Sequence, residues 1–300
     1  MTKTATGTLR RGGAVKAISH LRVLAFMSAL VPMIAGCSTM AQDVHVDGTV
    51  WQPDEQTAYP TGHWDVLGGQ NLLVQWTAFD NMSLIDGSAL PTAPYHVDWQ
   101  RIGQQPWARN VILGLATYPS EPKARANVAK LVTQSLDIAR VPVPLHVTGY
   151  YFPVEVDPTW KDVSAFAARL ADLPRPLWIT VYDQSNIGPV PLADWMQTWL
   201  PPDVGVFFQD GCGVYAREPR IARQYLDVLS ERFGKQRIRV IAEAFRPAGG
   251  ETFRPATADE IRPQLLAYKG YSVYLFDGPH YVSDSTIRLL APEASAHKGF

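Results

Sequence analysis

Apolar runs recur along the chain at a spacing that is typical of buried parallel strands. Between most of them lie segments whose apolar residues follow the 3.6-residue period of a helix, and Thr257 with Glu260 predicts a capping box before one of these. The predicted helices cover residues 123–139, 160–173, 191–200, 217–233 and 258–268. The predicted strands cover residues 48–51, 71–76, 110–115, 146–152, 177–182, 204–208, 238–242 and 271–276.

Eight strands that are mostly separated by helices predict an α/β fold, a single-domain (β/α)8 TIM barrel. The predicted barrel spans residues 47–290, a length that suits this fold. Its first connection, 51–71, is short, and its second, 81–109, is long and loop-rich. An open doubly wound sheet is the alternative, but no Gly-rich phosphate loop follows the first strand.

The N-terminal region has the pattern of a secretory leader. A basic segment with Arg10, Arg11, Lys16 and Arg22 precedes an apolar stretch over residues 23–35. We expect a signal peptide over residues 1–36, a tether over 37–46 and a C-terminal tail over 291–300.

The end of this leader, Ile34-Ala35-Gly36-Cys37, resembles the lipobox of bacterial lipoproteins. The resemblance implies lipidation of Cys37 and a membrane anchor, and Ser38 is similar to residues that permit sorting to the outer membrane. The implied location is the cell envelope, at the periplasmic face of the outer membrane. The alternative is an ordinary signal peptide with an incidental cysteine.

The composition limits the kinds of binding partner that we expect for this chain. The chain is 46% hydrophobic and 18% charged, with a formal net charge of −1, which gives no reason to expect nucleic acid. The second cysteine, Cys212, is interpreted as a small buried residue. His63, His96 and His146 lack metal-ligand spacing, so neither a metal nor another cofactor is expected.

Acidic residues stand at or just past the ends of four predicted strands: Glu155, Asp210, Glu243 and Asp277. In a barrel these ends surround one mouth, where active sites lie. Glycoside hydrolysis requires two carboxyl groups that flank the scissile bond. The four acids therefore indicate a glycosidase site.

Glu155 and Glu243, on the fourth and seventh strands, resemble the catalytic pair of a large clan of retaining barrel glycosidases. The resemblance implies that Glu155 is the acid/base and Glu243 the nucleophile. That clan usually has Asn before the fourth-strand Glu, and this chain has Val154. Asp210 is expected to orient or tune one of the pair, and Asp277 to bind a hydroxyl or a neighbouring side chain.

Three segments resemble an uncharacterised bacterial family of barrel proteins related to glycoside hydrolases. They are residues 48–53, residues 149–157 with a Tyr-x-Pro-x-Glu-x-Asp pattern, and residues 208–213 with Gln-Asp-Gly-x-Gly. The resemblance covers about residues 46–281 and implies a glycosidase-like barrel without naming a substrate.

Aromatic and polar residues near the strand ends extend the predicted site. Sugar rings pack on aromatic faces, although about half of these rings are expected to pack within the barrel top instead. The candidate platforms are Trp51, Trp76, Tyr151, Tyr182 and Phe208, and the candidate hydrogen-bonding side chains include Gln75, Gln209, Arg246 and His280.

The sequence thus predicts a lipid-anchored glycoside hydrolase that acts on an exopolysaccharide or a cell-envelope glycan. Candidate partners are the polysaccharide substrate, the membrane through Cys37, and a machinery that synthesises or exports exopolysaccharide. The alternative, favoured by Val154, is a barrel lipoprotein that binds glycan or an envelope complex without turnover.

Overall fold

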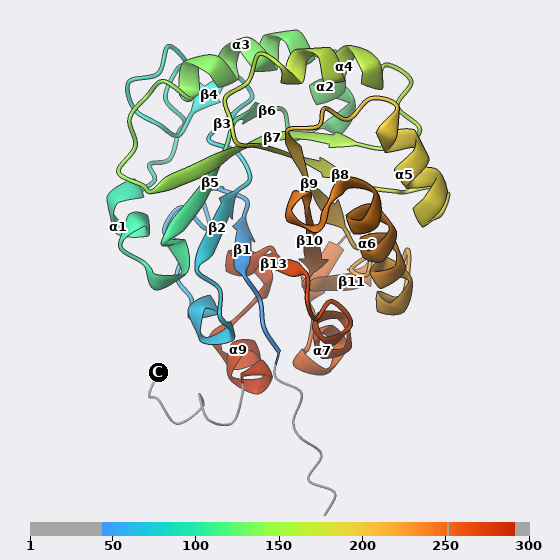
Figure 1. The fold of residues 1–300 in the computed structure, drawn as a ribbon. Helices are drawn as coiled ribbons and strands as arrows, with labels where there is room; N and C mark the ends of the chain where they lie inside the picture. The colour runs from blue at the N-terminus through green and yellow to red at the C-terminus, as the bar shows by residue number, and fades with distance from the viewer. Residues whose placement is uncertain (1–43, 251, 292–300) are drawn as a thin grey trace, which may run out of the picture. The chain divides into compact units, whose positions relative to one another are not determined.

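Eight parallel strands close into a barrel in the computed structural model, which describes residues 44–250 and 252–291 (Figure 1). The predicted (β/α)8 fold is confirmed. Around the barrel the order is β1-β13-β10-β9-β8-β7-β5-β2. The strands are β1 (Gly48–Trp51), β2 (Asn71–Val74), β5 (Asn110–Gly114), β7 (Val147–Val156), β8 (Leu177–Val181), β9 (Val204–Gln209), β10 (Ile238–Glu243) and β13 (Ser272–Phe276).

The interior of the barrel is filled by one large apolar layer to which every strand contributes one side chain. Its members are Val50, Leu73, Ile112, Tyr151, Trp178, Phe207, Ile241 and Tyr274. The Phe207 ring lies 5.3 Å from Trp178 and 5.0 Å from Tyr274, centroid to centroid. Because this layer closes the barrel centre, a ligand can meet inward-facing side chains only beyond it, at the strand ends.

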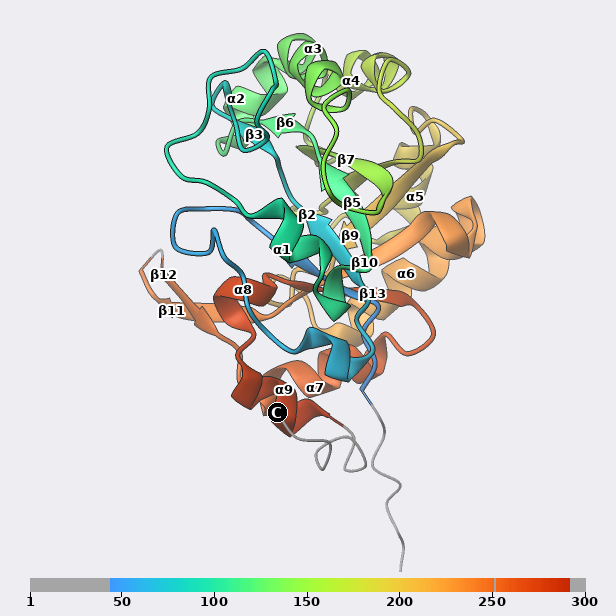
Figure 2. The same cartoon turned by 90° about the vertical axis from the view of Figure 1, so that its left-hand side faces the viewer.

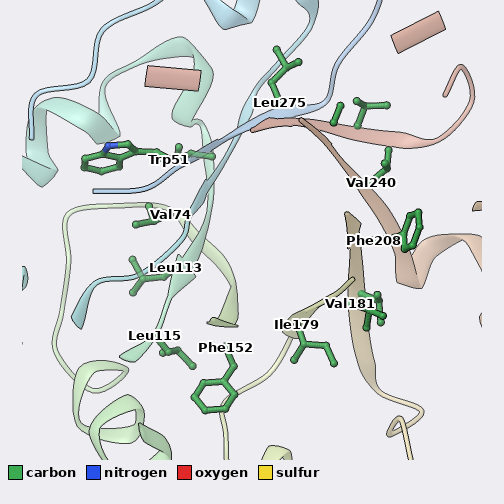
Figure 3. Packing of buried hydrophobic residues seen from close by; sticks show 14 of the residues in the cluster. Trp51, Val74, Leu113, Leu115, Phe152, Ile179, Val181, Phe208, Val240 and Leu275 are labelled. Carbon is green, nitrogen blue, oxygen red and sulfur yellow. The ribbon is translucent and has the colours of Figure 1, made fainter. Parts of the chain in front are cut away.

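The opposite faces of the strands pack against helices, and Figure 3 shows part of this outer cluster. Phe208, for example, stacks on Tyr225 of α6 with 5.0 Å between centroids. Burial of both strand faces explains why the runs are continuously apolar. The longer helices outside the barrel are α3 (Val128–Ile138), α4 (Val163–Leu170), α5 (Pro189–Gln197), α6 (Pro219–Phe233), α7 (Ala258–Ala267) and α9 (Asp284–Leu290).

The helix predicted over 123–139 is two helices, α2 (Glu121–Ala126) and α3. Asn127 separates them with φ −123° and ψ 23°, and its side-chain amide donates to the Lys123 carbonyl at 2.8 Å. Asparagine competes with helical backbone bonds in this way. The predicted capping box of α7 is confirmed, because Thr257 and Glu260 exchange both of its hydrogen bonds.

The first two connections differ in length as predicted. In the described chain the first holds the 3-10 turn η1 (Trp64–Leu67), and the second holds α1 (Trp99–Gly103) and η2 (Pro106–Ala108). A small sheet of β3 (Ala78–Phe79), β4 (Met82–Ser83) and β6 (Ala116–Thr117) lies beside them. On another side, Figure 2 shows the hairpin of β11 (Phe245–Gly249) and β12 (Thr252–Pro255) next to α8 (Gly278–Tyr281).

The predicted signal peptide, Cys37, most of the tether and the tail from residue 292 lie outside the described residues. Within the predicted tether, Val44 and Val46 are buried in the core, and the Val46 amide donates to the Leu67 carbonyl at 3.0 Å. Packing against the barrel therefore begins at least by residue 44. In the part of the chain that the structure describes, no helix has the length and apolarity to cross a bilayer.

Candidate active site

A cavity of about 380 Å³ lies over the apolar layer, at the carboxyl ends of the strands. Its floor includes Tyr151 and Ile241, which belong to the apolar layer, and Thr180, which does not. Its wall includes the side chains of Gln52, Gln75, Trp76, Thr117, Tyr118, Glu121, Glu155, Gln209 and Phe276. Polar groups thus gather around one apolar floor, which is typical of a small-molecule site.

Glu155 reaches this cavity from an irregular part of β7. Phe152 pairs with Ile179 and Val156 with Val181, so β7 carries two extra residues against β8. The Thr117 hydroxyl donates to the Pro153 carbonyl at 2.6 Å within this bulge. Bulges re-aim side chains beside active sites, and here the bulge presents Glu155 to the cavity.

The Glu155 carboxyl accepts a 2.6 Å hydrogen bond from the Gln209 side-chain amide. Its pKa is raised above the ordinary range, mainly because burial disfavours the charged form. The Gln209 hydrogen bond and the nearby Arg125 charge oppose the shift, and Asp157 adds to it. The structure thus places the Gln209 amide against the Glu155 carboxyl. That carboxyl is half-buried, and its affinity for a proton is raised.

Glu121 is a cavity residue that the sequence analysis missed. It is the first residue of α2, and its Oε2 accepts a hydrogen bond from the Glu155 backbone amide at 3.1 Å. Burial, followed by the Glu155 charge, raises the pKa of Glu121 to about 7. A signal was present: Ser120, Glu121 and Pro122 mark a helix start directly after the third strand.

Glu243 lies at the end of β10 and is 4% exposed. Its Oε2 accepts a 2.7 Å hydrogen bond from the Gly213 amide, in the loop that follows β9. A Cβ on Gly213 would lie 2.8 Å from Oε2 of Glu243 and 2.8 Å from the Phe245 ring. This loop therefore covers the Glu243 carboxyl, which does not line the cavity.

Glu243 nevertheless interacts electrostatically with the other acids. Its pKa is raised by burial, next by the Asp210 charge, and to a smaller extent by Glu155. Burial also raises the pKa of Tyr182 to about 12, with contributions from Glu243, Glu155 and Asp210. The half-buried Tyr182 thus lies within electrostatic range of all three carboxyls.

Asp210 is fully buried and points toward α7. It accepts hydrogen bonds from the backbone amides of Cys212 and Glu243 at 3.1 and 3.3 Å, from the Tyr268 hydroxyl at 2.9 Å, and from the Gln264 side chain. Burial raises its pKa. Asp210 contacts the Glu243 backbone but does not line the cavity.

Asp277 and His280 also lie behind the cavity wall. The buried Asp277 carboxylate accepts from the Gln52 amide at 2.8 Å and lies 2.9 Å from Nδ1 of His280. His280 Nε2 lies 3.0 Å from Asp54, and the hydrogen bond to Asp277 is the largest cause that raises the pKa of His280 to about 9. This bridge holds the backbone of Gln52, whose side chain lines the cavity.

Three of the sequence-predicted ligand contacts need correction. Trp51 and Phe208 have no exposed surface because they belong to the outer cluster, where Figure 3 labels both. Arg246 is buried and donates to the carbonyls of Glu243 and Phe245. Strand alternation turns the two rings away from the mouth, and Arg246 is occupied in joining β10 to α7.

Of the remaining predicted aromatic contacts, Trp76 and Tyr151 line the cavity and Tyr182 does not. Trp76 lines the cavity, and its indole N–H donates to the Pro53 carbonyl at 3.2 Å. Tyr151 forms part of the cavity and hydrogen-bonds Thr180. Gln75 also lines it, and its buried Oε1 has no hydrogen-bond partner among the described residues.

A larger hollow of about 610 Å³ lies elsewhere, lined in part by Cys212, Tyr215, Arg217 and Glu260. It contains neither Glu121 nor Glu155, so the smaller cavity is the better candidate. Cys212 is 4% exposed, as predicted. The described residues hold no group of three or more His, Cys, Asp or Glu side chains arranged to bind a metal ion.

Comparison with known proteins supports the fold. No family model matches the chain. No curated protein matches it. Among solved structures, the putative alpha-L-fucosidase from Bacteroides thetaiotaomicron is 13% identical, with a TM-score of 0.57, over 83% of this chain and 91% of that chain.

The chitinase from Chromobacterium violaceum is 9% identical, with a TM-score of 0.45, over 85% of this chain and all of that one, 100%. At such identities the first likeness concerns the fold alone. That likeness agrees with the (β/α)8 barrel of this chain.

Proposed function

We propose that this protein is a glycoside hydrolase that acts on a polysaccharide through carboxyl groups at the mouth of the barrel. One observation carries the proposal: Glu155, with a raised pKa, faces a cavity that is also lined by three glutamine side chains and Trp76. A carboxyl of high proton affinity can protonate a glycosidic oxygen at near-neutral pH.

The lining suits a carbohydrate. Gln52, Gln75 and Gln209 each offer a donor and an acceptor, the pattern that a sugar hydroxyl requires. The buried Oε1 of Gln75 lacks a partner among the described residues and would accept from such a hydroxyl. The indole of Trp76 offers an apolar face for the ring.

In the proposed reaction Glu155 donates its proton to the leaving oxygen as the bond to the anomeric carbon breaks, and the bond electrons stay with that oxygen. The Glu243 carboxylate attacks the anomeric carbon and forms a glycosyl ester. Water then attacks the same carbon, Glu155 takes the water's proton, and Glu243 leaves as a carboxylate. Asp210, which accepts from the Glu243 amide, would position that residue.

The anchor belongs to the proposal as well. Lipidation of Cys37 would hold the barrel at the periplasmic face of the outer membrane. The substrate class that follows is an exopolysaccharide or a cell-envelope glycan, and a machinery that makes or exports such a polymer would be the neighbouring partner.

One observation favours the second candidate, a lipoprotein that binds glycan without turnover. Glu243 is 4% exposed and Gly213 covers its carboxyl, so a substrate reaches it only if this loop moves. In that case the cavity would bind a sugar unit with Glu155 as a hydrogen-bonding side chain.

Hydrolysis assays with isolated exopolysaccharides and envelope glycans test the proposal. Reducing ends released by the wild type should fall by about 10²–10⁴-fold in Glu155→Gln, since a general acid contributes that much. Glu243→Gln should lose turnover as well, whereas Glu231→Gln, the same change on the exposed side of α6, should not. Equal product from all four proteins would overturn the catalytic roles.

The anomer formed first, read by proton NMR, tests the retaining mechanism. Retention supports a glycosyl ester at Glu243, and inversion would contradict it. Glycan binding that persists in Glu155→Gln without hydrolysis by the wild type would favour the second candidate.

A further inference from the structure

Two carboxyl groups, rather than one, face the cavity from adjacent elements. Glu155 comes from the bulge of β7 and Glu121 from the first turn of α2. The two residues are in direct contact, because the Glu155 backbone amide donates to Oε2 of Glu121 at 3.1 Å. Any sugar unit in a cavity of about 380 Å³ would therefore lie near both acids.

The basic residue beside this pair, Arg125, is largely engaged elsewhere. Its Nε donates to the Glu155 backbone carbonyl at 3.0 Å, and its guanidinium lies 5.4 Å from the Trp160 ring. Among the described residues neither Glu121 nor Glu155 forms an ion pair. Two half-buried carboxylates would thus line one cavity with incomplete compensation of their charge.

The surroundings add further negative charge. Besides Arg125, the charged group that acts on the pair is Asp157 just past β7. The charge of Glu155 in turn raises the pKa of Tyr151, Tyr182 and Glu243. Of these groups only Arg125 is cationic, so the charge balance favours retention of a proton by the pair.

The two acids differ in their partners. Glu155 accepts from the Gln209 side chain, which stabilises its charged form, whereas among the described residues Glu121 accepts only the backbone amide of Glu155. The Glu121 carboxyl is therefore the more readily protonated member when one proton is shared.

We propose that Glu121 and Glu155 act as one carboxyl pair that carries a single proton into the reaction, so that Glu121 is a further residue of the catalytic machinery. This inference rests on the proposed glycosidase function. When the pair gives its proton to the leaving oxygen, two carboxylates remain in one cavity. Their repulsion then favours removal of a proton from the attacking water. The water oxygen bonds to the anomeric carbon as the ester bond to Glu243 breaks, Glu243 leaves as a carboxylate, and the pair returns to its singly protonated state.

A titration without substrate tests the pair. Full-length protein labelled with ¹³C at the glutamate side-chain carboxyls is followed by NMR from pH 3 to pH 10. We expect the Glu121 and Glu155 resonances to report two coupled steps, the later one near pH 7. In Glu155→Gln, the midpoint of Glu121 should fall by about one pH unit or more, because the like charge that raises it is gone.

Glu231→Gln is the matched control and should move neither midpoint. Glu121→Asp, which retains the acid on a shorter side chain, should keep the coupling, and near-UV circular dichroism checks that each variant folds. If Glu121 titrates below pH 5 in the wild type, and Glu155→Gln leaves that midpoint unchanged, the pair does not exist.

The same variants separate this inference from the proposed function. With an active substrate, Glu121→Gln should shift the alkaline limb of kcat/KM to lower pH, whereas a purely structural residue would lower activity evenly across pH. If the two acids titrate as a coupled pair but the wild type hydrolyses no glycan, the proposed glycosidase function is wrong and the carboxyl pair stands. If the wild type hydrolyses a glycan and Glu121→Gln leaves the pH profile unshifted, the carboxyl pair is wrong and the proposed glycosidase function stands.

Discussion

The two halves of the barrel mouth hold their acids in opposite ways. On the side of β7 and α2, Glu155 and Glu121 are half-buried, face the cavity and receive few hydrogen bonds. On the side of β9 and β10, Asp210 and Glu243 are almost fully buried and accept from backbone amides. In the first half the carboxyl groups can still form hydrogen bonds with a ligand. In the second half the carboxyl groups use their hydrogen bonds to hold the protein's own loop.

This contrast shows that an acid at a strand end is not by itself a substrate contact. A carboxylate that accepts several hydrogen bonds from its own fold stabilises the fold, and its removal leaves buried donors unpaired. A carboxylate with few partners beside a cavity can exchange a proton with whatever enters. The stability of variants should therefore separate the two halves.

The largest effect on stability is expected at Asp210. Asp210→Ala leaves the amides of Cys212 and Glu243 and the Tyr268 hydroxyl without their acceptor, at a cost of about 3–5 kcal/mol in free energy of unfolding. Urea denaturation measures this. Asp172→Ala, at an exposed carboxylate on the protein surface, is the control and should stay within about 0.5 kcal/mol. If Asp210→Ala lowers the free energy of unfolding by less than about 1 kcal/mol, the two halves of the mouth do not differ in this way.

A smaller loss is expected where the loop covers Glu243. In Gly213→Ala the new methyl group would meet the Glu243 carboxyl and the Phe245 ring at 2.8 Å. Overpacking of this kind costs about 1–3 kcal/mol. Calorimetry should show a lower Tm, and turnover should fall because the Glu243 carboxyl is displaced. Unchanged Tm and turnover would mean that the loop is free to move away from Glu243.

The third effect concerns Glu121, is similar in size to that at Gly213, and should have the opposite sign at neutral pH. The folded-state pKa of about 7 lies above the ordinary value of 4.5, so the folded protein binds more protons between these limits. Stability from this group is complete below about pH 4.5 and is lost as pH rises through 7.

Glu121→Gln removes that loss. Relative to wild type, the variant should gain on the order of 1–3 kcal/mol between pH 5 and pH 8, measured by urea denaturation across pH. Glu231→Gln should run parallel to wild type. A Glu121→Gln curve parallel to wild type would instead place Glu121 among ordinary surface acids.

The chain pattern alone was enough for the barrel, because burial of both strand faces produces continuous apolar runs and the intervening helices keep a 3.6-residue period. It also led to Glu155 and Gln209, since both stand where a buried strand meets its loop. The fold likeness to the putative alpha-L-fucosidase from Bacteroides thetaiotaomicron agrees with the barrel.

Other features depended on the tertiary structure. In a strand buried on both sides, sequence does not reveal which residues face the barrel centre, so Trp51 and Phe208 looked as accessible as Trp76. The β7 bulge and the turn before α2 bring Glu121 next to Glu155 although they are far apart in sequence. The acids could be found from their positions along the chain. Which of them face the cavity was decided by strand alternation, loop coverage and hydrogen-bond partners, which exist only after the chain has folded.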